Sequence, residues 1–492
     1  MHRINTKRSG KVGEIALKLD MSKAFDKIEW GCLEKIMYKM GFHDSWVKLM
    51  MRYVNTVTYS IKINGRPRGH ITPSRGLRQG DPLSPFLFLF CVEGLSALIR
   101  KSVEFGLLSG VAACPRGPKI SHLFFADDSL IFCKATIEEC TTLEEILEIY
   151  ECSSGQQLNW EKTSLFFSWN TPHEIKEAIK SRFGANIIRQ YETYLGLPSL
   201  VGKNRCNTFR ALKEKLSNKL SGWKEKLLSH ASKEVLIKAV TQAIPIYTMS
   251  IFQLLSAPCD ELTSMVRSFW WGQHNGKNKI ACTSWDKIYA LKIKGGFGFH
   301  DLKAFNLVLL TKQGWRLQTN TSSLVHRVFK ARYFPETDFL SADLGPRPSY
   351  AWRSIIAAQR IVQHGYRWQV GDGNSIKLWS DKWLPPCSTF KVSTHPHALH
   401  VDSHVSSLID NDTSYWRIGL IKEIFLQHDA EAILSIPLST NRPPDRIIWA
   451  FTPNGRFTVN FAYKVALSLL HTTIGSLGSP SKTFSQQNPT CT

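Results

Sequence analysis

A chain of 492 residues with 43% hydrophobic and 21% charged residues has the composition of a folded protein, not of a disordered or collagen-like one. Its 62 lysines and arginines outnumber its 40 aspartates and glutamates, which gives a net charge of +22. Such a surplus favours a polyanionic partner, most commonly nucleic acid, over the alternative of a merely well-solvated basic surface.

Cysteine usage and the apolar runs indicate the compartment. The 11 cysteines include no C-x-x-C pair, so we expect a reducing environment and no disulfide framework. Four of them lie among apolar residues and are expected to be buried: Cys32, Cys91, Cys133 and Cys152. No secretory signal follows Met1, and the longest apolar run, Phe86–Val92, is too short to span a bilayer. The sequence therefore predicts an intracellular protein that is neither secreted nor inserted in a membrane.

Strand and helix signals alternate up to about residue 200. Strands are predicted at 15–19, 57–63 and 164–168, and a hairpin at 123–133. Helices are predicted from Trp30 to Gly41, from Pro82 or Pro85 to about Arg100, and around 143–150 with Gly155 as the C-cap. The dipeptide Asn64-Gly65 is typical of a hairpin turn. This alternation favours an α/β or α+β domain.

The pattern changes after residue 200. Two amphipathic helices are predicted at 209–220 and 232–244, and residues 201–240 hold ten Lys and Arg against three Glu. Tryptophans recur further on without a repeat period, and most of them are expected in cores, although some could stack on bases. From about Gly475 the chain is rich in Ser, Thr, Pro and Gln and is expected to be loose.

Three carboxylates lie where apolar segments end. Asp20 closes the strand at 15–19, and Asp127 and Asp128 occupy the tip of the predicted hairpin. A half-buried carboxylate is costly without a positive partner, so three of them favour a shared cation such as a pair of Mg²⁺ ions. Taken singly, Asp20 could instead be a helix N-cap, and Asp127-Asp128 could be ordinary turn residues.

The surrounding sequence carries a family resemblance. Three segments occur in order: Lys18–Asp26 (KLDMSKAFD), Arg78–Pro85 (RQGDPLSP) and Phe124–Asp128 (FFADD). They resemble the first three palm motifs of reverse transcriptases, in the form found in LINE-type (non-LTR) retrotransposons. Two further segments are similar to the fourth motif and to the primer-grip hairpin of that family: Gly155–Thr163 (GQQLNWEKT) and Tyr194–Pro198 (YLGLP). The resemblance covers roughly residues 13–200. The later segments Trp270–Gly272 and Gly295–Gly298 look like the less specific downstream region of plant LINE-type elements.

The resemblance implies an α+β fold: a right-hand polymerase palm, built as an antiparallel sheet with packed helices, then a helical thumb and a mixed, Trp-rich downstream region. The expected divisions are a palm with residual fingers at 1–200, a thumb-like region at 201–295, a connection region at 296–440, the start of a zinc-binding region at 441–470 and a loose tail at 471–492. Trp449–Val459 resembles the opening of that zinc-binding region, but the Cys and His ligands of the family do not follow, so no structural zinc is expected. By comparison with the family, the chain is expected to be truncated at both ends.

The resemblance also implies roles for single residues. Asp20 and Asp127 would be the principal ligands of two Mg²⁺ ions, or of Mn²⁺ in their place, with Asp128 beside them. Phe25 would lie under the sugar of the incoming nucleotide and exclude a 2′-hydroxyl, although it could also be a core residue. The remaining assignments are nucleotide or template–primer contact for Gln79 and Gly80, general acid for Lys162 unless it is a solvated lysine, and phosphate-backbone contact for Lys213, Lys219 and Lys224.

The function implied by the resemblance is RNA-directed DNA polymerisation. The chain would extend a DNA primer on an RNA template from dNTPs, in the nucleus or in a cytoplasmic ribonucleoprotein. The alternative is a catalytically inactive retroelement remnant that retains only nucleic-acid binding. An RNA-directed RNA polymerase is disfavoured by Phe25.

Overall fold

In the computed structural model, the apolar segment at 15–19 forms β1 (Glu14–Leu19), the middle strand of a five-stranded sheet with the order β6-β7-β1-β8-β9. The other strands are β6 (His122–Phe125), β7 (Asp128–Lys134), β8 (Ser164–Phe167) and β9 (Asn186–Ile187). β1 pairs antiparallel with both β7 and β8, whereas β8 and β9 are parallel. The sheet is therefore mixed. The expectation of an antiparallel sheet is wrong for the pair of β8 and β9, where β9 is an edge strand.

The structure describes residues 2–188, 194–198, 201, 209–223, 228–274, 277–278, 281–290, 292, 295–385, 389–396, 399–410 and 412–475. The chain divides into two units, Met1–Gly202 (unit 1) and Lys203–Thr492 (unit 2). Across the described residues, no helix combines the length and the apolarity that crossing a bilayer requires.

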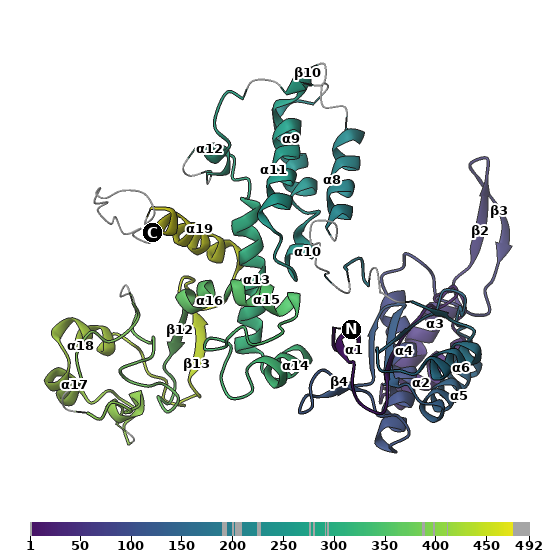
Figure 1. The fold of residues 1–492 in the computed structure, drawn as a ribbon, viewed down its shortest axis with the longest axis horizontal. Helices are drawn as coiled ribbons and strands as arrows, with labels where there is room; N and C mark the ends of the chain where they lie inside the picture. Colours follow the sequence, from purple (N-terminus) through teal and green to yellow (C-terminus); the bar gives the residue numbers. More distant parts are fainter. Residues whose placement is uncertain are drawn as a thin grey trace. The chain divides into compact units, whose positions relative to one another are not determined.

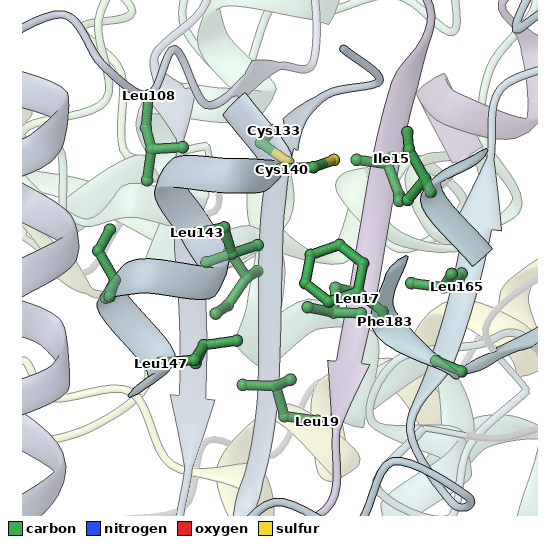
Figure 2. Packing of buried hydrophobic residues seen from close by; sticks show 14 of the residues in the cluster. Ile15, Leu17, Leu19, Leu108, Cys133, Cys140, Leu143, Leu147, Leu165 and Phe183 are labelled. Atoms are coloured by element: carbon green, nitrogen blue, oxygen red, sulfur yellow. The ribbon is translucent and has the colours of Figure 1, made fainter. Parts of the chain in front are cut away.

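Helices cover one face of the sheet in unit 1. They are α4 (Ser84–Glu104), α5 (Ile137–Ser154) and α6 (His173–Phe183). Their apolar residues pack on Ile15, Leu17 and Leu19, the side chains that β1 turns to this face (Figure 2). Ala16 of β1 lies in a second cluster on the opposite face, with Leu130 and Phe132 of β7. Because β1 is buried on both faces, its sequence is a nearly continuous apolar run.

A second core joins three helices of unit 1. It is formed by α2 (Trp30–Lys39), α3 (Asp44–Asn55) and the first turns of α4, with the loop after β1. The helix α3 leads into a hairpin of β2 (Tyr59–Ile63) and β3 (Arg66–Ile71), and Asn64 and Gly65 at its turn have φ of +50° and +82°. Both central residues therefore adopt the positive φ that a type I′ hairpin turn requires. The short elements of this unit are α1 (His2–Thr6), β4 (Val111–Ala112) and β5 (Lys119–Ile120).

Unit 2 is mainly helical. Its first helices are α8 (Arg210–Gly222), α9 (His230–Leu236), a π-helical segment (Ile237–Thr241), α10 (Ile246–Met249), α11 (Ser256–Trp271) and α12 (Trp285–Tyr289). The next are α13 (Leu302–Thr319), α14 (Leu324–Tyr333), α15 (Tyr350–Ala357), α16 (Gln359–Gly365), a 3₁₀ turn (Val405–Leu408), α17 (Ile418–Ile424), α18 (Gln427–Leu434) and α19 (Val459–Gly475). Two short antiparallel pairs complete it: β10 (Gln273–His274) with β11 (Lys277–Asn278), and β12 (Tyr366–Gln369) with β13 (Arg446–Trp449).

The predicted positions of two residue types can be compared with the structure. Tryptophans of unit 2 pack into cores as expected, and Trp352, Trp383 and Trp449 are each 0% exposed. Cys91 and Cys133 are buried, but Cys32 is half-buried and Cys152 is exposed. The prediction for Cys152 is wrong because the helical period of α5 turns this residue away from the face that carries Leu147 and Tyr150.

Candidate active site

The strand register of unit 1 brings two carboxylates together. β1 and β7 pair so that Leu19 lies opposite Ser129, and one more residue along the same register sets Asp20 opposite Asp128. Side chains on a strand alternate between its faces, so both carboxylates lie on the face opposite the helices α4 and α5. Both residues are half-buried. The two strands thus end in a pair of acidic residues at one edge of the sheet.

The hairpin between β6 and β7 places the third carboxylate. Phe125 pairs with Asp128, which leaves Ala126 and Asp127 as the two residues of the turn. Ala126 has φ +51°, a left-handed conformation that costs a non-glycine residue of order 1 kcal/mol. Asp127 is exposed at the tip. The turn therefore presents this carboxylate to solvent instead of packing it.

Lys18 supplies a positive charge at the same edge. Its ammonium lies 3.6 Å from a carboxylate oxygen of Asp128, and both side chains are about one-third exposed. In the part of the chain that the structure describes, no three His, Cys, Asp or Glu side chains gather closely enough to hold a metal ion. The acidic edge is thus an open arrangement with a lysine beside it, and not a closed cage. The sequence analysis missed Lys18, although its place two residues before Asp20, on the same face of β1, was a signal for it.

The loop after β1 is held by the segment Gly155–Thr163. The amide of Asn159 donates to the carbonyl of Asp20 over 2.8 Å, and the amide of Ser22 donates to the carbonyl of Gln157 over 2.8 Å. The side-chain amide of Gln156, which is 1% exposed, donates to the carbonyl of Ala24 over 2.6 Å. The segment Gly155–Thr163 therefore fixes the backbone at the first carboxylate, Asp20, and in the loop that follows it.

Gly155 closes this contact. It ends α5 with φ +73°, and a Cβ atom there would lie 2.4 Å from the carbonyl oxygen of Lys27. A side chain at this position would therefore push the loop after β1 away. The positioning roles of Gln156 and Gly155 were not predicted, because they depend on contacts between segments more than 100 residues apart.

Phe25 lies on the loop that the fourth motif holds. Its carbonyl accepts a hydrogen bond from the amide of Leu77 over 2.7 Å, and its ring stacks on Phe88 at 4.8 Å between centroids. The ring is half-buried. One side of Phe25 is therefore a core contact, as the packing alternative predicted, and the rest of the ring remains accessible.

Gln79 and Gly80 follow in an exposed loop. The Gln79 amide lies 3.5 Å from the Asp26 carboxylate, and Gly80 has φ +84° with open space where a Cβ would stand. Glycine is therefore favoured at residue 80 by its backbone angle, not by packing within the described structure. The next residue, Asp81, accepts hydrogen bonds from the Tyr53 hydroxyl at 2.7 Å and the Leu83 amide at 2.8 Å, and these bonds hold the pKa of its carboxyl below the ordinary value.

Three of the four predicted lysines lie in the described residues and are exposed. Lys162 lies in the turn before β8, three residues after the Asn159 that bonds to Asp20. In unit 2, Lys213 and Lys219 lie on α8, and the Lys213 ammonium forms an ion pair with Glu261 of α11 at 2.8 Å. Lys224 lies outside the described residues.

Comparison with known proteins agrees with the motifs. A family model described as reverse transcriptase (RNA-dependent DNA polymerase) matches residues 2–198. The chain is 41% identical over 143 residues to an uncharacterised mitochondrial protein of Arabidopsis thaliana, a match that covers 29% of this chain and 93% of that protein. The chain belongs to the reverse transcriptase family.

Two further relatives place this reverse transcriptase among those of non-LTR retrotransposons and their plant counterparts. It is 31% identical over 146 residues to a retrovirus-related Pol polyprotein from a type-1 retrotransposable element R2 of Popillia japonica, over 30% of this chain and 23% of that protein. It is 30% identical over 273 residues to a putative ribonuclease H protein of Arabidopsis thaliana, over 55% of this chain and 44% of that protein. The reverse transcriptase thus spans less than half the length of these two relatives.

Proposed function

We propose that this reverse transcriptase is an RNA-directed DNA polymerase that extends a DNA primer on an RNA template from dNTPs. The observation that carries the proposal is the register of β1 and β7, which sets Asp20 opposite Asp128 beside the hairpin tip that bears Asp127. These residues fall within the segment that matches the reverse transcriptase family. In this proposal, unit 1 contains the palm, and the helices α8 and α11 belong to a thumb.

The donor set fits a divalent metal. Carboxylate oxygens are the ligands that Mg²⁺ prefers, and this ion is commonly held by one or two carboxylates while substrate phosphates complete its shell. The acidic edge already accommodates the ammonium of Lys18, and Asp127 is exposed, which leaves access for a triphosphate. Asp20 and Asp127 would be the principal ligands of two ions, with Asp128 beside them. When bound, the metal would supply charge stabilisation at the primer 3′-hydroxyl and the leaving pyrophosphate.

The other motif residues orient the substrate. Phe25 would place its accessible ring edge under the C2′ position of the incoming nucleotide and exclude ribose by collision. Gln79 and Gly80 would contact the nucleotide or the template–primer from the exposed loop, and Lys162 would donate a proton to the departing pyrophosphate. In unit 2, Lys213, Lys219 and Lys224 would contact the phosphate backbone.

Primer extension with Mg²⁺ tests the proposal. Asp127→Asn removes a negative charge from an exposed turn, so the fold should persist while extension falls by about a thousandfold, which corresponds to roughly 4 kcal/mol. The matched control is Asp26→Asn, an exposed aspartate of the first motif to which no chemistry is assigned.

Two results would contradict the proposal. Equal extension by the Asp127→Asn and Asp26→Asn proteins would remove Asp127 from the chemistry. A parent protein that binds template–primer but adds no nucleotide would favour the alternative, an inactive remnant that retains nucleic-acid binding.

A further inference from the structure

Residues 45–80 of unit 1 form a cationic segment without a single acidic residue. Asp44 precedes this segment and Asp81 follows it. It contains seven basic residues: Lys48, Arg52, Lys62, Arg66, Arg68, Arg75 and Arg78. The uniformly positive charge of residues 45–80 favours binding to a polyanion.

The centre of this segment is the β2–β3 hairpin, here called the arm (Tyr59–Ile71). Figure 1 shows the arm extending away from the sheet and helices of unit 1. Every residue of both strands is exposed. Among the described residues, no carboxylate forms an ion pair with Lys62, Arg66 or Arg68. The charges of the arm are therefore not neutralised within the described structure.

One face of the arm is both apolar and cationic. Directly paired residues of an antiparallel hairpin project to the same face. The pairs on this face are Tyr59 with Ile71, Ile61 with Arg68, and Ile63 with Arg66. Ile61 is 59% exposed and Ile63 is 54% exposed. An isolated two-stranded hairpin is marginally stable in water, so a face of this kind is expected to gain stability from a partner.

The base of the arm is fixed to the candidate active site. The loop that follows the arm donates from the Leu77 amide to the carbonyl of Phe25, and from the Gly76 amide to the carbonyl of Ile28 over 2.8 Å. Gly76 also approaches the loop so closely that a Cβ there would lie 2.6 Å from the carbonyl oxygen of Asp26. A ligand held along the arm would therefore be held relative to the loop that carries Phe25.

We propose that the arm binds the phosphodiester backbone of the template–primer without reading its sequence. The guanidinium groups of Arg66 and Arg68 suit phosphate oxygens, and the isoleucines between them offer an apolar surface to the sugars. The identity of the nucleic acid as template–primer rests on the proposed function; the phosphate chemistry of the arm does not.

The test measures binding of the full chain to a fluorescein-labelled RNA template–DNA primer at several KCl concentrations. Both variant sets are made in the Asp127→Asn protein, so that no extension occurs during the titration. The arm variant is Lys62→Gln with Arg66→Gln and Arg68→Gln. The control carries the same loss of charge at three other exposed lysines of unit 1: Lys35→Gln, Lys39→Gln and Lys101→Gln.

The logarithm of the association constant K falls linearly with the logarithm of the salt concentration. Each lost phosphate contact makes this negative slope shallower by roughly 0.7 to 0.9. Arg66 and Arg68 share the proposed contact face, whereas Lys62 projects to the other face of the arm. The magnitude of the slope should therefore fall by about 1.5 to 2 in the arm variant, and the control should keep the parent slope. A labelled blunt duplex and a labelled single strand, titrated in parallel, separate duplex from overhang as the part of the template–primer that the arm contacts.

Two results would overturn the arm proposal. One is a slope in the arm variant equal to that of the parent or of the control. The other is a lower molar mass of the arm variant than of the parent by light scattering, which would make the arm a contact between two copies of the chain. Because the readout is binding, an inactive parent protein would contradict the polymerase proposal alone.

Discussion

The two units of this reverse transcriptase use their most conspicuous residues in opposite ways. In unit 1, the motif residues Asp20, Asp127 and Gln79 stay outside the apolar clusters and lie at the edge of the sheet or in an exposed loop. In unit 2, the recurring tryptophans are buried or half-buried, and the ring of Trp352 stacks on those of Tyr333 and Phe334 at 4.7 and 5.5 Å between centroids. These polar residues of unit 1 thus remain accessible, whereas the recurring aromatic residues of unit 2 contribute to cores.

The basic residues extend the comparison. Lys213 of unit 2 is paired with Glu261, whereas the arm of unit 1 carries basic side chains without an ion-pair partner among the described residues. The number of basic residues along the sequence does not tell a paired lysine such as Lys213 from the unpaired basic residues of the arm. The presence of nearby acidic residues does distinguish them. Residues 45–80 contain no Asp or Glu, whereas α11 of unit 2 supplies the Glu261 carboxylate to Lys213.

The largest effect is expected from Trp352→Ala, which tests whether the two units are separate in stability. Removing a fully buried indole leaves a cavity and should lower the free energy of unfolding of its surroundings by about 3–5 kcal/mol. Hydrogen exchange should show faster exchange in α14 and α15 and unchanged protection in β1 and β7. The control is Trp169→Ala in unit 1, where the side chain is 66% exposed and the cost should be below about 1 kcal/mol. Parallel loss of protection in both units would show that they unfold as one.

A smaller effect is expected from Phe25→Val, which tests whether a residue can serve the core and the site together. The shorter side chain should raise incorporation of rNTP relative to dNTP by roughly tenfold, because the collision with the 2′-hydroxyl is relieved. Phe90→Val is the matched control, since Phe90 is also a half-buried phenylalanine packed on the same cluster. Competition between the two nucleotide types in single-nucleotide extension gives the ratio. Equal discrimination by parent and Phe25→Val would leave Phe25 with its core role alone.

The smallest effect is expected from replacing Lys213, Lys219 and Lys224 together with Gln. The slope of log K against log salt should fall by less than the arm variant causes, because Lys213 is already engaged by Glu261. Lys312, Lys422 and Lys464 of unit 2 are exposed and provide a control with the same change of charge. A larger fall for Lys213, Lys219 and Lys224 than for the arm would reverse the comparison between the units.

Much of unit 1 could be predicted because its signals are local. The strand β1, the hairpin of β6 and β7, and the end of α5 at Gly155 follow from apolar runs, turn residues and helical period. The helix α3 was not anticipated, and neither was the parallel pairing of β9. A parallel pairing depends on a crossover, here through α6, and no local pattern records which strand the chain will return to.

The candidate site divides in the same way. The carboxylates could be found because each closes an apolar segment within a recognisable motif. The contacts that position them could not, since Gln156 and Ala24 are 132 residues apart and meet only in the folded chain. The exposure of Ala126 and Asp127 at one tight turn likewise depends on the pairing of Phe125 with Asp128.

Lys18 has a consequence for the resting enzyme under the proposed function. With its ammonium 3.6 Å from Asp128, the acidic edge carries a tethered counter-ion of single charge before any substrate arrives. If Asp20, Asp127 and Asp128 hold a divalent ion as proposed, that ion would take the place of the Lys18 ammonium beside Asp128, and Lys18 would become available to a phosphate. Because the pair is partly exposed, its strength is small, and separating Lys18 from Asp128 would cost little. Under the proposed function, Lys18 would reduce the repulsion between the carboxylates in the absence of substrate. A divalent ion would then bind stably only when the nucleotide supplies its remaining ligands.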